Sequence, residues 1–182
     1  MNPSVIDLIL LGQVISKPAS AYDLAHLLDK HNLTEMVRIS KPAIYSNIRK
    51  LLERSYLEGR ITKTRRRPEK RVCYPTDKGQ ARFQELMAHF AARPVRYHFD
   101  FNALIISVSQ LPQEMGEPLL EQLRSGLEEQ RRLLQGRLHA PGELSFTDRS
   151  VMRQQYLLNE ALLKWLREFS SGYRARMISS IQ

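Results

Sequence analysis

The 182-residue sequence contains a single cysteine, Cys73, and a single tryptophan. One cysteine excludes a disulfide framework within the chain and is typical of a reducing compartment. No apolar run approaches the roughly 20 residues of a membrane span, since Asp7 interrupts the most apolar stretch. The N-terminus also lacks the pattern of a cleaved signal peptide. The sequence therefore predicts a cytoplasmic protein that does not associate with membranes.

Catalytic and metal-binding motifs are also missing. The five histidines are dispersed, and the sequence has no HExxH, CxxC or GxSxG motif and no glycine-rich phosphate loop. An active site needs a nucleophile, a base and an orienting group within mutual reach, and scattered residues do not supply them. We therefore expect no enzyme activity, no catalytic residue, no bound metal and no cofactor.

Positive charge is abundant and unevenly distributed. The formal net charge is +9, and residues 1–92 hold 16 Lys and Arg against 9 Asp and Glu. Residues 93–182 hold 12 against 10. A basic half followed by a nearly neutral half predicts a polyanion-binding domain at 1–92 and a domain with another task, such as self-association, at 93–182.

The segment from Ser40 to Tyr56 has the pattern of an amphipathic helix. Ser40 is a suitable N-cap, Pro42 fits the first turn, and apolar residues recur at helical spacing. The other face carries hydrogen-bonding side chains of different lengths, which suit base edges and phosphates in a DNA groove. Taken alone, the pattern also fits an ordinary solvated helix. The candidate DNA contacts in this segment are Ser40, Lys41, Tyr45, Ser46 and Arg49.

A basic hairpin is predicted directly after this helix, which Gly59 is expected to end. Residues 60–64 and 71–74 have strand patterns on either side of a proline-containing turn. From Arg60 to Arg71, seven basic residues stand against one acid, and such density favours a polyanion as neighbour. The candidate phosphate contacts are Lys63, Arg65, Arg66, Arg67, Lys70 and Arg71.

Two helices are predicted before Ser40, at 3–13 with Asn2 as N-cap and at 21–31 with Ser20 as N-cap. Ser20 and Tyr22, at the start of the second helix, are further candidates for phosphate contact. Three helices followed by a hairpin give the order of a winged helix-turn-helix, in which the third helix reads DNA.

A fourth helix is predicted from Thr76 to about Ala92, and it leads out of the hairpin. The following stretch, 93–100, mixes proline, charge and aromatics without a clear period. We therefore expect it to be the hinge between the two halves.

The second half predicts helices at about 99–111, 117–138 and 148–179, the last with Thr147 as N-cap. A helix of roughly 30 residues spans about 45 Å, which is too long for a small domain to cover alone. Apolar stripes at near-heptad spacing therefore predict a two-fold dimer. The candidate dimerisation residues are Leu120, Leu123, Leu127, Leu158, Leu162, Trp165 and Phe169.

Four motifs in the first half resemble those of the PadR family of winged-helix transcriptional regulators. They are 8–12 (LILLG), 20–24 (SAYDL), the apolar pattern of 39–51, and the hairpin exit 74–79 (YPTDKG). In that family the recognition helix carries a tyrosine at the place held by Tyr45. Ser55 departs from the pattern, since glycine is usual at its position. The resemblance implies a regulator that binds duplex DNA.

The second half resembles the helical dimerisation domain of the longer PadR subgroup, whose tail is similar to that of virulence-gene activators. The resemblance implies a homodimer. By its symmetry such a dimer would bind a palindromic operator and either block or assist polymerase, and a repressor is the favoured alternative. The resemblance also implies a small aromatic effector, although ordinary packing explains the same aromatic residues. The candidates for an effector pocket are Tyr97, Phe99, Phe101 and Trp165.

The expected fold is mainly α with a small β-hairpin, a winged helix-turn-helix domain followed by an α-helical dimerisation domain. Three functions remain open at this point. The first is a dimeric regulator of double-stranded DNA, and the second is an adaptor whose winged helix binds an acidic protein or RNA. The third is a scavenger protein that binds an aromatic compound with no effect on DNA affinity. An adaptor would prefer no DNA duplex, and its binding to polyanions would vanish at physiological salt.

Overall fold

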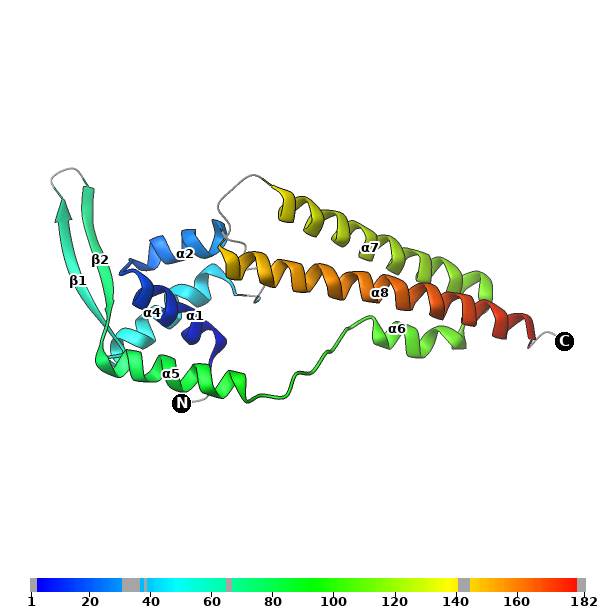
Figure 1. The fold of residues 1–182 in the computed structure, drawn as a ribbon, viewed down its shortest axis with the longest axis horizontal. Coiled ribbons are helices and arrows are strands. Elements are labelled where there is room, and N and C mark those ends of the chain that lie inside the picture. The colour runs from blue at the N-terminus through cyan, green and yellow to red at the C-terminus, as the bar shows by residue number, and fades with distance from the viewer. Residues whose placement is uncertain (1–2, 31–36, 38, 65–66, 141–144, 180–182) are drawn as a thin grey trace. The chain divides into compact units, whose positions relative to one another are not determined.

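The structure is a computed structural model that describes residues 3–30, 37, 39–64, 67–140 and 145–179. The chain divides into two compact units, residues 1–95 and 96–182. In the described residues, helices dominate and a single two-stranded sheet is present (Figure 1). The predicted fold class, mainly α with a small hairpin, is therefore confirmed.

The first unit contains four described helices and the hairpin. The order is α1 (Val5–Ser16), α2 (Ala21–Lys30), α4 (Lys41–Glu53), β1 (Leu57–Thr64), β2 (Arg67–Pro75) and α5 (Asp77–Ala91). The hairpin is antiparallel, and its strands extend away from the helices of this unit (Figure 1).

Side-chain caps fix where three of these helices begin. Ser40 Oγ accepts a hydrogen bond from the Ala43 amide at 3.3 Å, and Thr76 Oγ1 accepts one from the Gly79 amide at 3.0 Å. At α2, the Ser20 hydroxyl accepts from the Asp23 amide, and the Asp23 carboxylate accepts from the Ser20 amide. Each cap satisfies amides that have no partner within the first turn of its helix.

Two predicted helix limits in this unit are wrong. The N-cap of α1 is Ser4, whose Oγ accepts from the Asp7 amide at 3.3 Å, whereas the predicted cap Asn2 lies outside the described residues. Gly59 does not end α4, because it lies within β1. The helix ends at Glu53, and Ser55 takes a left-handed backbone conformation with φ 58° that breaks the helical pattern.

The core of the first unit joins all of its helices to the root of the hairpin. Its buried side chains come from α1, α2, α4, both strands and α5. Cys73 of β2 is 1% exposed, and its amide donates to the Ala19 carbonyl at 2.9 Å. The hairpin root is thereby fixed to the segment that precedes α2.

Asp7 is a charged residue within this apolar core. Its side chain is 0% exposed, and neither carboxylate oxygen has a hydrogen-bond partner among the described residues. Burial raises the pKa of Asp7, and the opposing attraction of Arg82, Arg54 and Lys50 does not cancel that effect. A carboxyl with a raised pKa in the folded state favours folding most below its ordinary pKa of 3.8, and that contribution is lost as the pH rises through the folded-state pKa.

Asp7→Asn is therefore expected to stabilise the first unit at neutral pH, since the amide has nearly the same shape and carries no charge. The free energy of unfolding, measured in urea between pH 4.5 and pH 8, should show a gain that grows with pH until the wild-type carboxyl is fully ionised. A variant less stable than the wild type throughout this range would show that the attraction of Arg82 outweighs burial.

The second unit consists of α6 (Asn102–Ser107), a 3-10 turn (Val108–Gln110), α7 (Gln113–His139) and α8 (Phe146–Ser179). The long helices α7 and α8 lie side by side and antiparallel (Figure 1). Their contact buries Leu120 and Leu127 of α7 and Leu163 and Leu166 of α8, a cluster that also includes Val108 of the 3-10 turn and Tyr173.

The predicted cap Thr147 of the last helix is wrong. Ser145 Oγ accepts a hydrogen bond from the Asp148 amide at 3.1 Å, so α8 begins at Phe146. The helix predicted at 99–111 is shorter in the structure, because its α-helical part covers only Asn102–Ser107. Met115 and Gly116 already donate to the Pro112 carbonyl, so α7 begins earlier than predicted.

Candidate nucleic-acid interface

Helix α4 separates an apolar face from a hydrogen-bonding face. Ile44, Ile48 and Leu51 are at most 4% exposed and fix one side of the helix in the core. Lys41, Tyr45 and Arg49 follow each other at a spacing of four residues, so they form one stripe along the helix. All three are exposed.

The remaining predicted contacts of this helix are less accessible or already engaged. Ser46 is half-buried, and the Ser40 hydroxyl is used as the helix cap. Arg49 pairs with Glu53 at 3.8 Å on the same helix, and Lys41 pairs with a carboxylate of α2. These ion pairs are exposed, so a phosphate could replace either carboxylate at small cost.

The start of α2 offers one of its two predicted contacts to solvent. Tyr22 is 68% exposed. Ser20 is 5% exposed, and its hydroxyl donates to Asp23 Oδ2 at 2.9 Å while it accepts from the Asp23 amide. The capping function of Ser20 therefore accounts for its side chain, which leaves Tyr22 as the accessible group at this end of α2.

The basic side chains of β2 that the structure describes lie midway along the hairpin. Lys70 and Arg71 lie opposite Thr62 and Ile61 in the strand register, and Arg71 is exposed. The side chains of four other predicted contacts lie outside the described residues, so their placement stays a prediction. They are Lys63, Arg65, Arg66 and Arg67.

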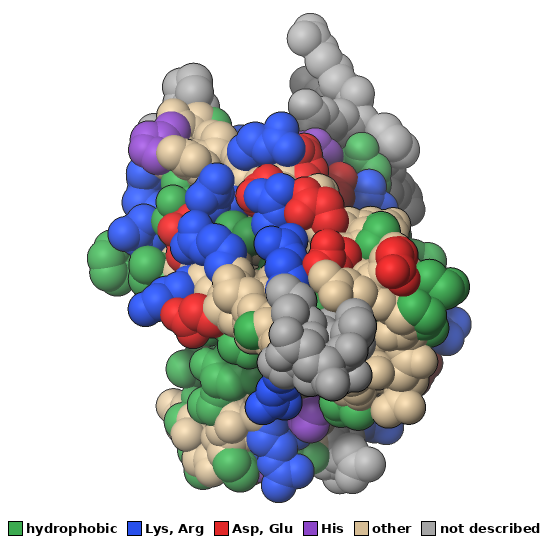
Figure 2. Space-filling view, turned by 90° about the vertical axis from the view of Figure 1, so that its right-hand side faces the viewer, with side chains coloured by type: hydrophobic (Ala, Val, Ile, Leu, Met, Phe, Trp, Pro, Cys, Tyr) green, Lys and Arg blue, Asp and Glu red, His purple; other side chains and the backbone are tan. Residues whose placement is uncertain are grey.

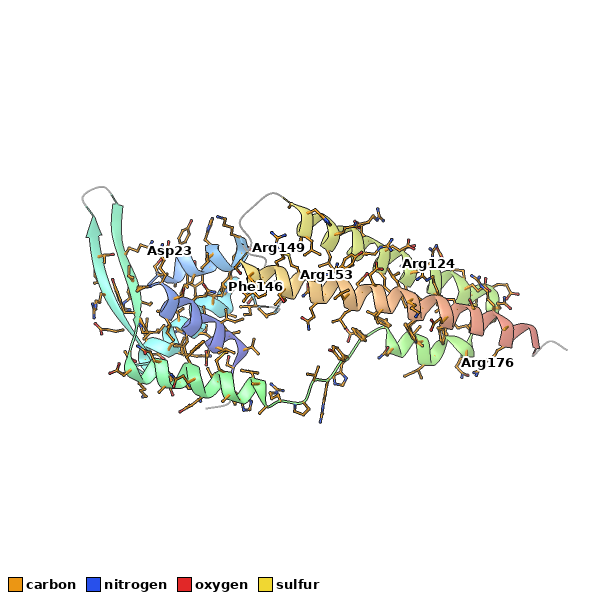
Figure 3. The ribbon with its side chains drawn as sticks, viewed as in Figure 1. Asp23, Arg124, Phe146, Arg149, Arg153 and Arg176 are labelled. Carbon is orange, nitrogen blue, oxygen red and sulfur yellow. The ribbon has the colours of Figure 1, made fainter. Side chains whose placement is uncertain are left out.

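Lys70 forms an ion pair with Asp23 of α2, which ties β2 to the helix that precedes α4. Partial burial acts to raise the pKa of Asp23, but hydrogen bonds from Lys70 and Ser20 outweigh it, and the pKa lies below its ordinary value. Asp23 is therefore ionised at neutral pH. Figure 3 shows this residue at the end of α2 nearest the hairpin.

Two groups at this surface escaped prediction. Arg60 of β1 lies 4.6 Å from the centre of the Tyr74 ring and donates to Glu58 at 2.8 Å, so the hairpin root holds a further cation. Asp29 of α2 lies 3.0 Å from Lys41 of α4. The run of basic residues could have pointed to Arg60, whereas no sequence pattern pairs an acid of one helix with a lysine of another.

The predicted effector residues form a stack of aromatic rings in the second unit. The ring centres of Tyr97 and Phe99 lie 6.5 Å apart, those of Phe99 and Phe101 lie 5.2 Å apart, and those of Phe101 and Trp165 lie 5.9 Å apart. Phe169 continues the stack beyond Trp165. The structure therefore brings the four predicted residues together, as neighbours in a stack.

A hollow of about 400 Å³ lies elsewhere in this unit, between α7 and α8. Its lining is largely charged, because Arg124, Arg167 and Arg174 face it together with two glutamates. Arg124 pairs with Glu121, and Arg174 pairs with Glu117 at 3.3 Å. Figure 2 views the second unit from the end where α7 begins and α8 ends, and it shows basic and acidic side chains side by side. None of the predicted aromatic residues lines this hollow.

The predicted dimerisation residues fall into two groups. Leu120 and Leu127 are at most 7% exposed, because α7 and α8 bury them against each other within one chain. The other five are half-buried and keep part of their surface accessible. These are Leu123, Leu158, Leu162, Trp165 and Phe169.

The fold of this chain is similar to the folds of several solved structures. Bacillus subtilis PadR in complex with operator DNA has 17% sequence identity and a TM-score of 0.73, with 90% of this chain and 95% of that chain covered. The Vibrio cholerae virulence activator AphA has 16% identity and a TM-score of 0.66, with coverage of 94% and 99%. The chain has the PadR fold.

A further example of the PadR fold is the PadR-like transcriptional regulator BC1756 from Bacillus cereus. It has 16% identity and a TM-score of 0.64, and the match covers 94% of this chain and 99% of that chain. No protein-family description matches the sequence, and neither does any curated protein. The match to the PadR fold spans both units of the chain and almost the full length of these proteins.

In the described residues, no three His, Cys, Asp or Glu side chains lie close enough together to hold a metal ion. Among the described helices, none is long and apolar enough to cross a membrane.

Proposed function

We propose that the chain is a homodimeric transcriptional regulator that binds palindromic double-stranded DNA. The observation that carries the proposal is the exposed stripe of Lys41, Tyr45 and Arg49 on a helix whose opposite side is fixed in the core. Lysine and arginine suit guanine edges and phosphates, and the tyrosine hydroxyl suits phosphates. The strongly basic hairpin that follows the helix supports the same function.

In this proposal the first turns of α4 enter a major groove, and the hairpin lies along the backbone or in the flanking minor groove. Tyr22 at the start of α2 contacts a phosphate. The solved complex of Bacillus subtilis PadR with operator DNA supports DNA binding as the function, since that protein has the same fold. Two-fold symmetry would place the half-sites about one helical turn, or a multiple of it, apart.

Selection from a pool of randomised duplexes at ~150 mM salt tests the proposal, because nonspecific phosphate contacts are much reduced there. A two-fold symmetric motif is expected to enrich. A folded protein that enriches no motif would contradict sequence-specific binding and would favour the adaptor that binds an acidic protein or RNA.

The proposed dimer uses an apolar stripe of α8. Val151, Leu158, Leu162, Trp165 and Phe169 follow one another at spacings of seven, four, three and four residues, so they share one side of the helix. Val151 is 39% exposed, and the others are half-buried. A second copy of the chain is the simplest means of covering such a stripe.

Leu158→Glu is expected to shift the protein from dimer to monomer, with a dissociation constant raised at least about a hundredfold, because the variant would bury a charge in an apolar contact. Sedimentation equilibrium measures the change. Leu157→Glu is the matched control, since the neighbouring Leu157 is already 51% exposed and lies about 100° around the helix. Equal behaviour of the two variants would exclude this stripe from the interface.

We also propose a repressor role and a small aromatic effector. Bacillus subtilis PadR has been solved in complex with p-coumaric acid, which supports an aromatic effector for a protein of the same fold. In this chain the stack from Tyr97 to Trp165 is the candidate binding region. Trp165 is the only tryptophan of the chain, so its fluorescence would report binding directly.

A further inference from the structure

Helix α2 carries two carboxylates, and each pairs with a lysine of an element proposed to face DNA. Asp29 Oδ2 lies 3.0 Å from Nζ of Lys41, in the first turn of α4. Asp23, labelled in Figure 3, pairs with Lys70 of the hairpin strand β2. Two of the proposed DNA contacts are therefore already neutralised in the protein without DNA.

The two pairs differ in how firmly they are held. Asp23 accepts hydrogen bonds from the Ser20 amide and hydroxyl as well as pairing with Lys70, so its position is fixed. Asp29 and Lys41 have side chains that are 51% and 60% exposed. An exposed ion pair is weak, and its lysine can exchange one anion for another. Lys41 is therefore the cation that can leave its carboxylate for DNA.

Lys41 occupies a place where a positive charge is poorly compensated. The first turn of α4 contains no acidic residue, and the N-terminus of a helix carries the positive end of its dipole. A lysine at such a site would attract any phosphate within reach, whatever the DNA sequence. Asp29 supplies from α2 the negative charge that α4 itself lacks.

We propose that Asp29 is an internal competitor that restrains the binding of Lys41 to DNA. Any DNA, random or specific, must break the Asp29–Lys41 ion pair before Lys41 can contact it. At the correct site, the oxygen and ring nitrogen of a guanine edge take the place of the carboxylate. The full cost of breaking the pair therefore falls on binding at the correct site, and only part of it on binding to random DNA, where Lys41 can keep its carboxylate. The inference rests on the proposed function, because it assumes that α4 reads DNA.

Asp29→Asn tests the inference on two duplexes, one with the motif that the wild type selects and one with its scrambled sequence. Affinity for the scrambled duplex is expected to rise about fivefold at ~150 mM salt, and its salt slope to steepen by ~0.9, the values for one additional phosphate contact. Affinity for the motif should rise at least as much, because the wild type breaks the pair completely there, so the ratio of the two affinities does not fall.

Two comparisons make the outcome decisive. Glu129→Gln on α7 makes the same change in net charge in the second unit, and Asp29→Asn in a Lys41→Gln background should give no gain in affinity beyond that of Glu129→Gln. Gains no larger than those of Glu129→Gln would overturn the inference, as would a gain of unchanged size in the Lys41→Gln background. A wild-type protein that fails to prefer any duplex would instead overturn the proposed function.

Discussion

Exchange of Arg65, Arg66 and Arg67 for glutamine is expected to lower the affinity for every duplex by about a hundredfold for each engaged hairpin at ~150 mM salt. Arginines that contact phosphates release counterions from DNA, and this contribution does not depend on base sequence. Three lost contacts should flatten the plot of log affinity against log salt by up to ~2 to 3 units. The preferred motif should stay the same, since α4 is intact.

Fluorescence anisotropy over a series of salt concentrations measures both quantities. The matched control removes three positive charges from α8 with Arg153→Gln, Lys164→Gln and Arg167→Gln, which lie away from the proposed dimer stripe. Similar losses of affinity in both triple variants would show that net charge alone, and not contact by the hairpin, causes the loss. An unchanged salt slope in the hairpin variant would exclude the hairpin tip from DNA contact.

Gly79→Ala is expected to destabilise the first unit by about 1 to 3 kcal/mol or more. A β-carbon at Gly79 would overlap the carbonyl oxygen of Tyr56 and lie 3.0 Å from the carbonyl carbon. That oxygen cannot move aside easily, because it accepts hydrogen bonds from the amide of Thr76 at 3.3 Å and its hydroxyl at 3.1 Å. The clash falls at the junction between the end of α4, the hairpin and α5.

Thermal unfolding followed by circular dichroism gives the size of this effect. Gly136→Ala on α7 is the control, since a β-carbon there has no atom within 4 Å, and alanine in an exposed helix is favoured over glycine by roughly 0.5 to 1 kcal/mol. The two substitutions should therefore act in opposite directions. A stable Gly79→Ala protein would mean that the junction can rearrange.

Local signals in the sequence predicted the architecture well. The caps Ser20, Ser40 and Thr76 act within one helical turn, so a short stretch of sequence contains both partners. The hairpin and the two long helices were predictable for a similar reason, because alternation and helical spacing are local patterns. The errors at helix ends are also local. The observed N-caps, Ser4 and Ser145, each lie two positions from the predicted N-caps, Asn2 and Thr147.

Interactions between distant segments could not be predicted in this way. The pairing of Asp29 with Lys41 depends on how α2 packs against α4. The complete burial of Asp7, an acid in an apolar helix, depends on the packing of three helices. Leu120 and Leu127 illustrate a different limit of sequence-based prediction. An apolar stripe indicates that its residues are buried, but it does not indicate whether they pack against the same chain or against a second copy.

Cys73 is the single cysteine of the sequence, so its thiol can serve as a specific chemical probe of the hairpin. Its side chain is almost fully buried, burial raises the pKa of the thiol, and its amide is held by Ala19. A thiol reagent can react only after the hairpin root separates from the segment that precedes α2. The labelling rate of the wild-type protein therefore measures the free energy of that local opening, and the same assay with DNA present would show how strongly binding closes it.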